Sequence, residues 1–110
     1  MALLNETRNN FTEAIKFLKR FYFCAKLLDD HEGVEISLNK IGICFFMANQ
    51  AEDSLRFHEK HFEFTSKKQY DNDNSKMISL YNQAMAVRKI QIELSNQFLN
   101  QQEGLISSST

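Results

Sequence analysis

Hydrophobic residues recur at helical spacing through most of the chain, and polar breaks divide this pattern into four segments. The first predicted helix starts at Asn10, which can cap it with Glu13 as the capping-box partner. Its core positions alternate between spacings of four and three residues: Ala14, Leu18, Phe21, Ala25 and Leu28. The polar stretch 29–33 then interrupts the pattern, which predicts a turn.

Three further helices are predicted after this turn. The second covers about residues 34–49, and its apolar face consists of Leu38, Ile41, Gly42, Phe45 and Ala48. The third covers about residues 51–67, and its core face consists of Ser54, Leu55, His58, His61, Phe62 and Thr65. A polar loop over 67–75 leads to a fourth helix over about 75–102. That helix carries a stripe of near-heptad spacing: Leu80, Ala84, Val87, Gln91, Leu94 and Phe98.

The composition supports an all-α fold. The 110 residues contain no proline and only three glycines, which leaves few sites for the tight turns of a sheet protein. A chain of this length is expected to form one helical domain, here over residues 10–102. Residues 1–9 are expected to be a flexible N-terminus and residues 103–110 a disordered tail.

Charge and cysteine content favour a cytoplasmic protein that binds neither nucleic acid nor membrane. The formal net charge is −1, so the basic surface of a nucleic-acid-binding protein is not expected. The longest apolar stretch, 41–48, is too short to cross a bilayer, and the amino terminus lacks the layout of a secretion signal. Cys24 and Cys44 are too few for a disulfide framework and are expected to be reduced thiols.

The chain lacks the motifs of an enzyme or a cofactor site. It has no nucleophile elbow and no glycine-rich phosphate loop, so we expect no catalytic residues and no cofactor. His58 and His61 are three residues apart, whereas the zinc motif on a helix needs two histidines four apart. We therefore expect packing histidines and no metal site, and a metal-binding four-helix protein remains the alternative for this pair.

An internal repeat is present, because residues 14–21 align with residues 54–61 at an offset of 40. Before the second copy, Gly42 allows two antiparallel helices to approach closely, and Ser54 offers a second small contact. The pattern Leu38, Ile41-Gly42, Phe45, then Ser54-Leu55 and Phe57, resembles the tetratricopeptide repeat in its longer-repeat variety. The matched unit covers about 34–66. Residues 11–30 resemble the second helix of a preceding unit, and residues 75–102 resemble the first helix of a following one.

The match to this family has departures. His61 and Phe21 stand where the family prefers a small alanine, and Ser66 stands in place of its terminal proline. The last helix also continues without a break where a second helix should begin.

The resemblance implies a short superhelical array of stacked hairpins that binds a partner in the groove formed by the first helix of each unit. The residues of this chain at those positions are Ile36, Asn39, Ile43, Phe46, Met47, Tyr81, Met85 and Arg88. Ile43 stands where the family's clamp for a terminal carboxylate needs asparagine. The expected ligand is therefore an apolar helix or extended segment of a protein partner.

We therefore expect a non-catalytic protein-interaction or scaffold module of a larger assembly, with cytoskeletal and ciliary assemblies among those that the resemblance implies. Ten phenylalanines are many for such a short array, so some rings are expected to lie outside its core. The alternative is a structural four-helix bundle or coiled-coil homo-oligomer without a peptide groove, paired through the 75–102 helix.

Overall fold

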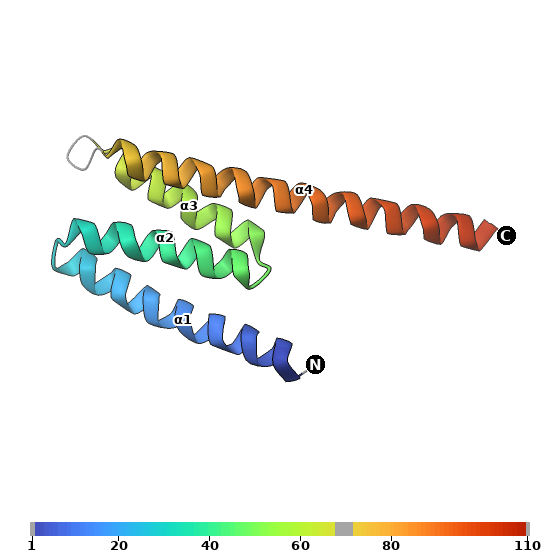
Figure 1. Cartoon of the computed structure of the whole chain (residues 1–110), viewed down its shortest axis with the longest axis horizontal. Helices are drawn as coiled ribbons and strands as arrows, with labels where there is room; N and C mark the ends of the chain where they lie inside the picture. The colour runs from blue at the N-terminus through green and yellow to red at the C-terminus, as the bar shows by residue number, and fades with distance from the viewer. Residues whose placement is uncertain (1, 68–71, 110) are drawn as a thin grey trace.

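The chain folds into four α-helices over the residues that the computed structural model describes, 2–67 and 72–109, with side chains described over 10–67 and 72–104. The helices are α1 (Ala2–Leu27), α2 (His31–Met47), α3 (Ala51–Thr65) and α4 (Asp73–Ser109). Consecutive helices run antiparallel and lie side by side (Figure 1). This confirms the predicted all-α fold of stacked hairpins with a long last helix.

Helix α4 is much longer than the space that its neighbours cover. Each of the other helices packs against the next one along the chain, and α2 also approaches α4. Past this body, α4 continues alone toward the C-terminus, so the molecule measures 63 × 33 × 17 Å (Figure 1). Every described side chain from Leu94 to Gly104 is exposed. We call residues 94–104 the projecting arm.

Three helices extend beyond their predicted ends. One is α2, which begins at His31, inside the predicted break 29–33. Helix α1 begins at Ala2 rather than at Asn10, and α4 continues to Ser109 rather than to Gln102. The segment before Asn10 contains no proline or glycine, so nothing in the local chain stops the helix there. A single glycine in a helix costs about 1 kcal/mol relative to alanine, and Gly104 does not end α4. The predicted start and end of these helices are therefore wrong, and Asn10 is an internal helical residue.

The turns after α1 and α2 each contain one residue in the left-handed region. These residues are Asp29, with φ 59°, and Asn49, with φ 69°. The N–H of Asp30 donates to the carbonyl oxygen of Ala25 at 2.9 Å, and the residue after Asn49 makes the equivalent bond at 2.8 Å. Such bonds close the C-terminal turn of a helix, and asparagine and aspartate tolerate the left-handed conformation there. The predicted breaks are therefore turns. The third predicted break, 67–75, lies partly outside the described residues.

Asp30 caps the N-terminus of α2 and provides a test of this hairpin. Its Oδ1 atom accepts a hydrogen bond from the N–H of Gly33 at 3.1 Å. We expect Asp30→Ala to lower the free energy of unfolding by about 1 kcal/mol in urea denaturation followed by circular dichroism. Glu59→Ala removes the same charge from an exposed position within α3 and should change stability by less than about 0.5 kcal/mol. Equal losses in the two variants would show that Asp30 does not act as a cap.

Helices α2 and α3 approach closely at Gly42 and Ser54, as predicted. Both residues are buried, and Ser54 Oγ donates to the carbonyl oxygen of Gly42 at 2.7 Å. A Cβ atom on Gly42 would lie 2.6 Å from the ring of His58. Packing, and not backbone conformation, therefore requires a glycine here. The predicted core face of α3 is confirmed: Ser54, His58, His61 and Thr65 are buried, and Leu55 and Phe62 are half-buried.

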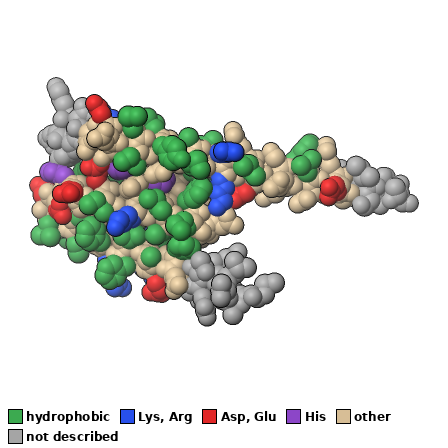
Figure 2. Space-filling view, viewed as in Figure 1, with side chains coloured by type: hydrophobic (Ala, Val, Ile, Leu, Met, Phe, Trp, Pro, Cys, Tyr) green, Lys and Arg blue, Asp and Glu red, His purple; other side chains and the backbone are tan. Residues whose placement is uncertain are grey.

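The predicted stripe on α1 is only partly buried. Ala25 is in the core, whereas Phe21 and Leu28 are exposed. Over the described residues, helix α1 packs mainly along α2, so much of its surface remains open. Phe17 and Phe23 are among its exposed side chains, which confirms that some rings lie outside the core. Figure 2 shows hydrophobic side chains spread over one face of the body and continuing onto the part of α4 that leaves it.

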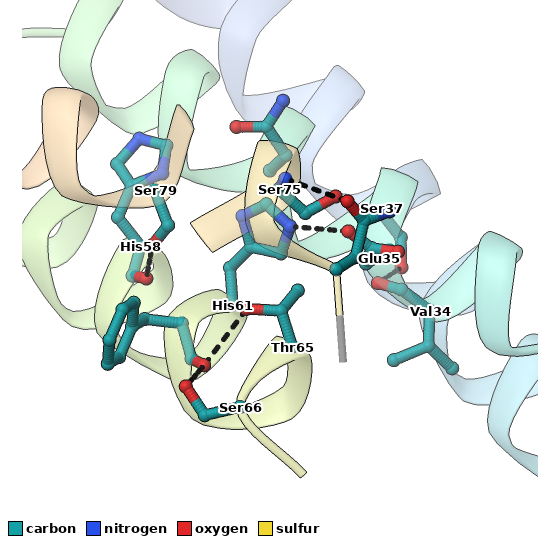
Figure 3. A network of polar contacts seen from close by, with 12 residues as sticks. Val34, Glu35, Ser37, His58, His61, Thr65, Ser66, Ser75 and Ser79 are labelled. Atoms are coloured by element: carbon teal, nitrogen blue, oxygen red, sulfur yellow. Dashed lines mark hydrogen bonds and ion pairs between the residues drawn. The ribbon is translucent and has the colours of Figure 1, made fainter. Parts of the chain in front are cut away.

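Helix α4 packs on the body through small residues and not through its near-heptad stripe. Among its described side chains, the buried ones are Ser79 and Ala86, both 0 % exposed, whereas Leu80 is 50 % exposed and Leu94 is 58 % exposed. Ser79 Oγ donates to the main-chain carbonyl oxygen of His58 (Figure 3). Small side chains let α4 lie close to α3, and this hydrogen bond satisfies a buried hydroxyl. The Leu80 stripe therefore lies outside the contact between α4 and the body.

Candidate interaction groove between α2 and α4

Helices α2 and α4 enclose an apolar cavity of about 180 Å³ on the body. Its lining contains four of the residues predicted to bind a partner: Ile43, Phe46, Tyr81 and Met85. Hairpin stacking brings them together, because α3 reverses the chain between α2 and α4 and lets these two helices approach. We call this cavity and its lining the α2/α4 groove.

Two polar contacts join α2 to α4 beside the groove. Asn82 Nδ2 donates to Asn39 Oδ1 at 3.1 Å, which uses the predicted residue Asn39 as a link between the helices. Lys89 Nζ donates to the carbonyl oxygen of Phe46 at 3.1 Å and lies 4.6 Å from the centre of the Phe46 ring. These contacts hold the two walls at a fixed separation, so the cavity is formed before any ligand binds.

The remaining predicted residues do not line the cavity. Ile36 and Met47 are exposed on α2, and Arg88 is exposed on α4. They come from the same two helices, but the cavity occupies only the part of the interface near Ile43. The predicted surface therefore extends along α2 in both directions beyond the cavity itself.

Sequence reasoning missed two lining residues, His58 and Asn82. His58 belongs to α3 and was placed in the core, where it also proves to be buried. Asn82 could have been found from spacing, because Asn82, Met85 and Lys89 are three and four residues apart and share one face of a helix.

His58 stands where three helices meet. Its ring is 1 % exposed, lies against Gly42 of α2, and its Nδ1 atom has no hydrogen-bond partner among the described residues. Burial, and secondly the nearby His61, lowers the pKa of His58 from 6.5 to about 4. The groove therefore has a neutral imidazole in its lining at pH 7, which suits an apolar ligand better than a charged one.

The second histidine belongs to a separate polar contact. His61 Nε2 lies 3.3 Å from Glu35 Oε1, so α3 and α2 are joined a turn away from His58 (Figure 3). Over the described part of the chain, no three His, Cys, Asp or Glu side chains gather closely enough to hold a metal ion. The histidine pair thus has structural contacts that account for its placement, without the further ligands that zinc needs.

Another cavity, of about 230 Å³, has a different chemical character. It lies where α1, α2 and α3 meet, and Lys26, Lys60 and Lys67 line it together with Glu63 and apolar residues. Lysine ammonium groups also lie over nearby rings, as Lys60 does at 4.8 Å from the centre of Phe57. Among the side chains that the structure describes, no lysine or acidic residue lines the α2/α4 groove, which is therefore the more apolar of these two cavities.

No helix in the described residues is long and apolar enough to span a bilayer. Comparison with known proteins found no matching family, no matching curated protein and no matching solved structure.

Proposed function

We propose that this protein is a non-catalytic interaction module that holds an apolar segment of a partner protein in the α2/α4 groove. The observation that carries this proposal is the assembly of Ile43, Phe46, Tyr81 and Met85 around one preformed cavity. The hairpin arrangement supports it, since the tetratricopeptide-like pattern of the sequence implies binding along the helices that form this groove.

The size of the cavity favours one side chain of a protein over a free small molecule. Its volume, about 180 Å³, is below the range of roughly 300–1,000 Å³ that is usual for small-molecule sites. An apolar anchor residue on a helix or extended segment would fill it, and the exposed Ile36 and Met47 would contact the flanking residues of that segment.

The proposed setting is a larger cytoplasmic assembly, of the cytoskeletal or ciliary kind that the repeat resemblance implies. Cys24 is a free and exposed thiol, which is typical of a reducing compartment. The net charge of −1 supports a protein partner rather than nucleic acid.

Peptide display on the immobilised chain tests the groove. We expect selected peptides to share one bulky apolar anchor. Ile43→Glu should weaken their binding by at least about tenfold, because it places a charge in an apolar cavity. Ile92→Glu is the matched control, since it makes the same change at an exposed isoleucine of α4 outside the cavity lining, and it should retain binding within about threefold.

Two results would contradict the proposal: selection that yields no apolar anchor, or selected peptides that bind Ile43→Glu as tightly as the native chain.

The NMR signals of side-chain methyl groups provide a direct readout as well. Bound peptide should shift the signals of Ile43 and Met85 more than that of Ile92, which is exposed further along α4.

A further inference from the structure

The six residues of α4 with near-heptad spacing form a continuous exposed stripe. We call this stripe the seam: Leu80, Ala84, Val87, Gln91, Leu94 and Phe98. Their spacing alternates between four and three residues without interruption, and Phe98 is 58 % exposed. A mean period of 3.5 residues is the spacing that keeps the contact face of one helix toward its partner in a coiled coil.

We propose that the seam is the interface between two copies of this chain, paired in parallel as a two-stranded coiled coil. The seam spans about 27 Å of helix and close to three heptads. In heptad terms Leu80, Val87 and Leu94 occupy d positions, and Ala84, Gln91 and Phe98 occupy a positions, where a single polar residue sets the register of the paired helices.

The polar residues of the seam favour a second copy in the parallel register. In this register Gln91 faces Gln91 of the other copy, so the two side-chain amides can bond to one another. The flanking residue Arg88 then faces the neutral Gln83 of the other copy. An antiparallel pairing centred on the seam would place Gln91 against Val87 and the two Arg88 side chains near each other, which leaves a buried amide unpaired and adds repulsion.

The seam is available along its whole length and is separate from the α2/α4 groove. At 100° per residue, the seam lies on a different side of α4 from Asn82 and Met85, which line the groove, and from the buried Ser79 and Ala86. Leu94 and Phe98 of the seam lie in the projecting arm, where α4 has left the body (Figure 1). Pairing through the seam thus goes beyond the proposed binding of a partner and does not depend on it.

Sedimentation velocity of the purified full chain tests the pairing. We expect the mass to rise from that of one chain to that of two between about 1 and 100 μM. Leu94→Asp should raise the dissociation constant at least about a hundredfold, because it buries a carboxylate in the seam. Asn96→Asp is the matched control: it adds the same charge to the same exposed arm on the outer side and should leave the dimer within about threefold. Both sites are exposed in the single chain, so folding should be unaffected.

Disulfide trapping tests the register. In a background of Cys24→Ser and Cys44→Ala, Gln91→Cys should give a crosslinked dimer under mild oxidation, whereas Asn96→Cys should not.

A sedimentation mass equal to that of one chain at all concentrations would overturn the proposal and would leave a different protein as the occupant of the seam. Equal dimerisation of Leu94→Asp and Asn96→Asp, or crosslinking at Asn96→Cys but not at Gln91→Cys, would overturn it too. Ile43→Glu should leave the dimer intact, so failure of the groove and failure of the seam are distinguishable.

Discussion

Gly42→Ala should lower the free energy of unfolding by about 1 kcal/mol. The added Cβ would lie 2.6 Å from Cε1 and Nε2 of His58, far inside contact distance, and that ring is held between three helices. Overpacking of a buried site costs about 1–3 kcal/mol and outweighs the gain of roughly 1 kcal/mol that alanine brings to a helix. Equilibrium unfolding in urea, followed by circular dichroism at 222 nm, measures this loss.

Gly104→Ala is the matched control for this substitution. Gly104 also lies within a helix, but no atom is within 4 Å of the position of its Cβ. Stability should therefore stay the same or rise slightly. A Gly42→Ala chain as stable as the native one would show that α2 and α3 are not as close as the bond between Ser54 and Gly42 requires.

The same substitution should also weaken groove binding. His58 lines the α2/α4 groove, so the open space toward which its ring can move is the cavity itself. A displaced ring would occupy the volume proposed for the anchor of the partner. Selected peptides should therefore bind Gly42→Ala less tightly than Gly104→Ala under conditions where both chains are folded.

Stability should fall in mild acid because of His58. The pKa of its imidazole is about 4 in the folded chain and 6.5 in the absence of the fold, so the unfolded chain binds the extra proton first as the pH falls. The contribution of the neutral ring is fully present above pH 6.5 and is lost progressively between pH 6.5 and 4. This pKa difference corresponds to a loss of at most about 3 kcal/mol in the free energy of unfolding.

The surroundings of His58 explain this direction. The groups that face it are Gly42 of α2, His61 one turn along α3, and Ser79 and Gln83 of α4 near its carbonyl oxygen. None of these is an acid that could stabilise an imidazolium.

Urea denaturation at several pH values between 7.5 and 4.5 measures the effect. His58→Gln removes the titrating group and should flatten the pH dependence relative to the native chain, whatever its stability at pH 7.5. Carboxylates that titrate near pH 4 affect both chains, so the comparison isolates the imidazole. Parallel curves for the two chains would contradict a neutral buried His58.

Local patterns were sufficient for much of the architecture. The helix count, the turns at Asp29 and Asn49, and the close approach of Gly42 to Ser54 all follow from short-range spacing and residue size. Such features depend on neighbours within a few residues, which a sequence displays directly. The predicted helix ends were less accurate. The sequence has no local signal that would prevent α1 from beginning as early as Ala2 or α4 from continuing to Ser109.

The lining of the groove was partly predictable from the repeat pattern. That pattern placed Ile43, Phe46, Tyr81 and Met85 on the groove faces of α2 and α4, and these four residues line the cavity. It did not identify His58, because a residue of α3 reaches the groove only when all three helices are packed. Nor could spacing along one helix show that the cavity ends before Ile36 and Met47.

The face that α4 presents to the body depended on tertiary packing alone. Hydrophobic periodicity shows that α4 has an apolar stripe, and it is silent on whether that stripe meets α3 or another chain. Helix α3 offers α4 a main-chain carbonyl oxygen at His58, and a small hydroxyl at Ser79 fits that surface better than the leucines do. The sequence by itself thus establishes four amphipathic helices and their turns. Close packing and hydrogen bonding between α3 and α4 then turn the Leu80 stripe outward.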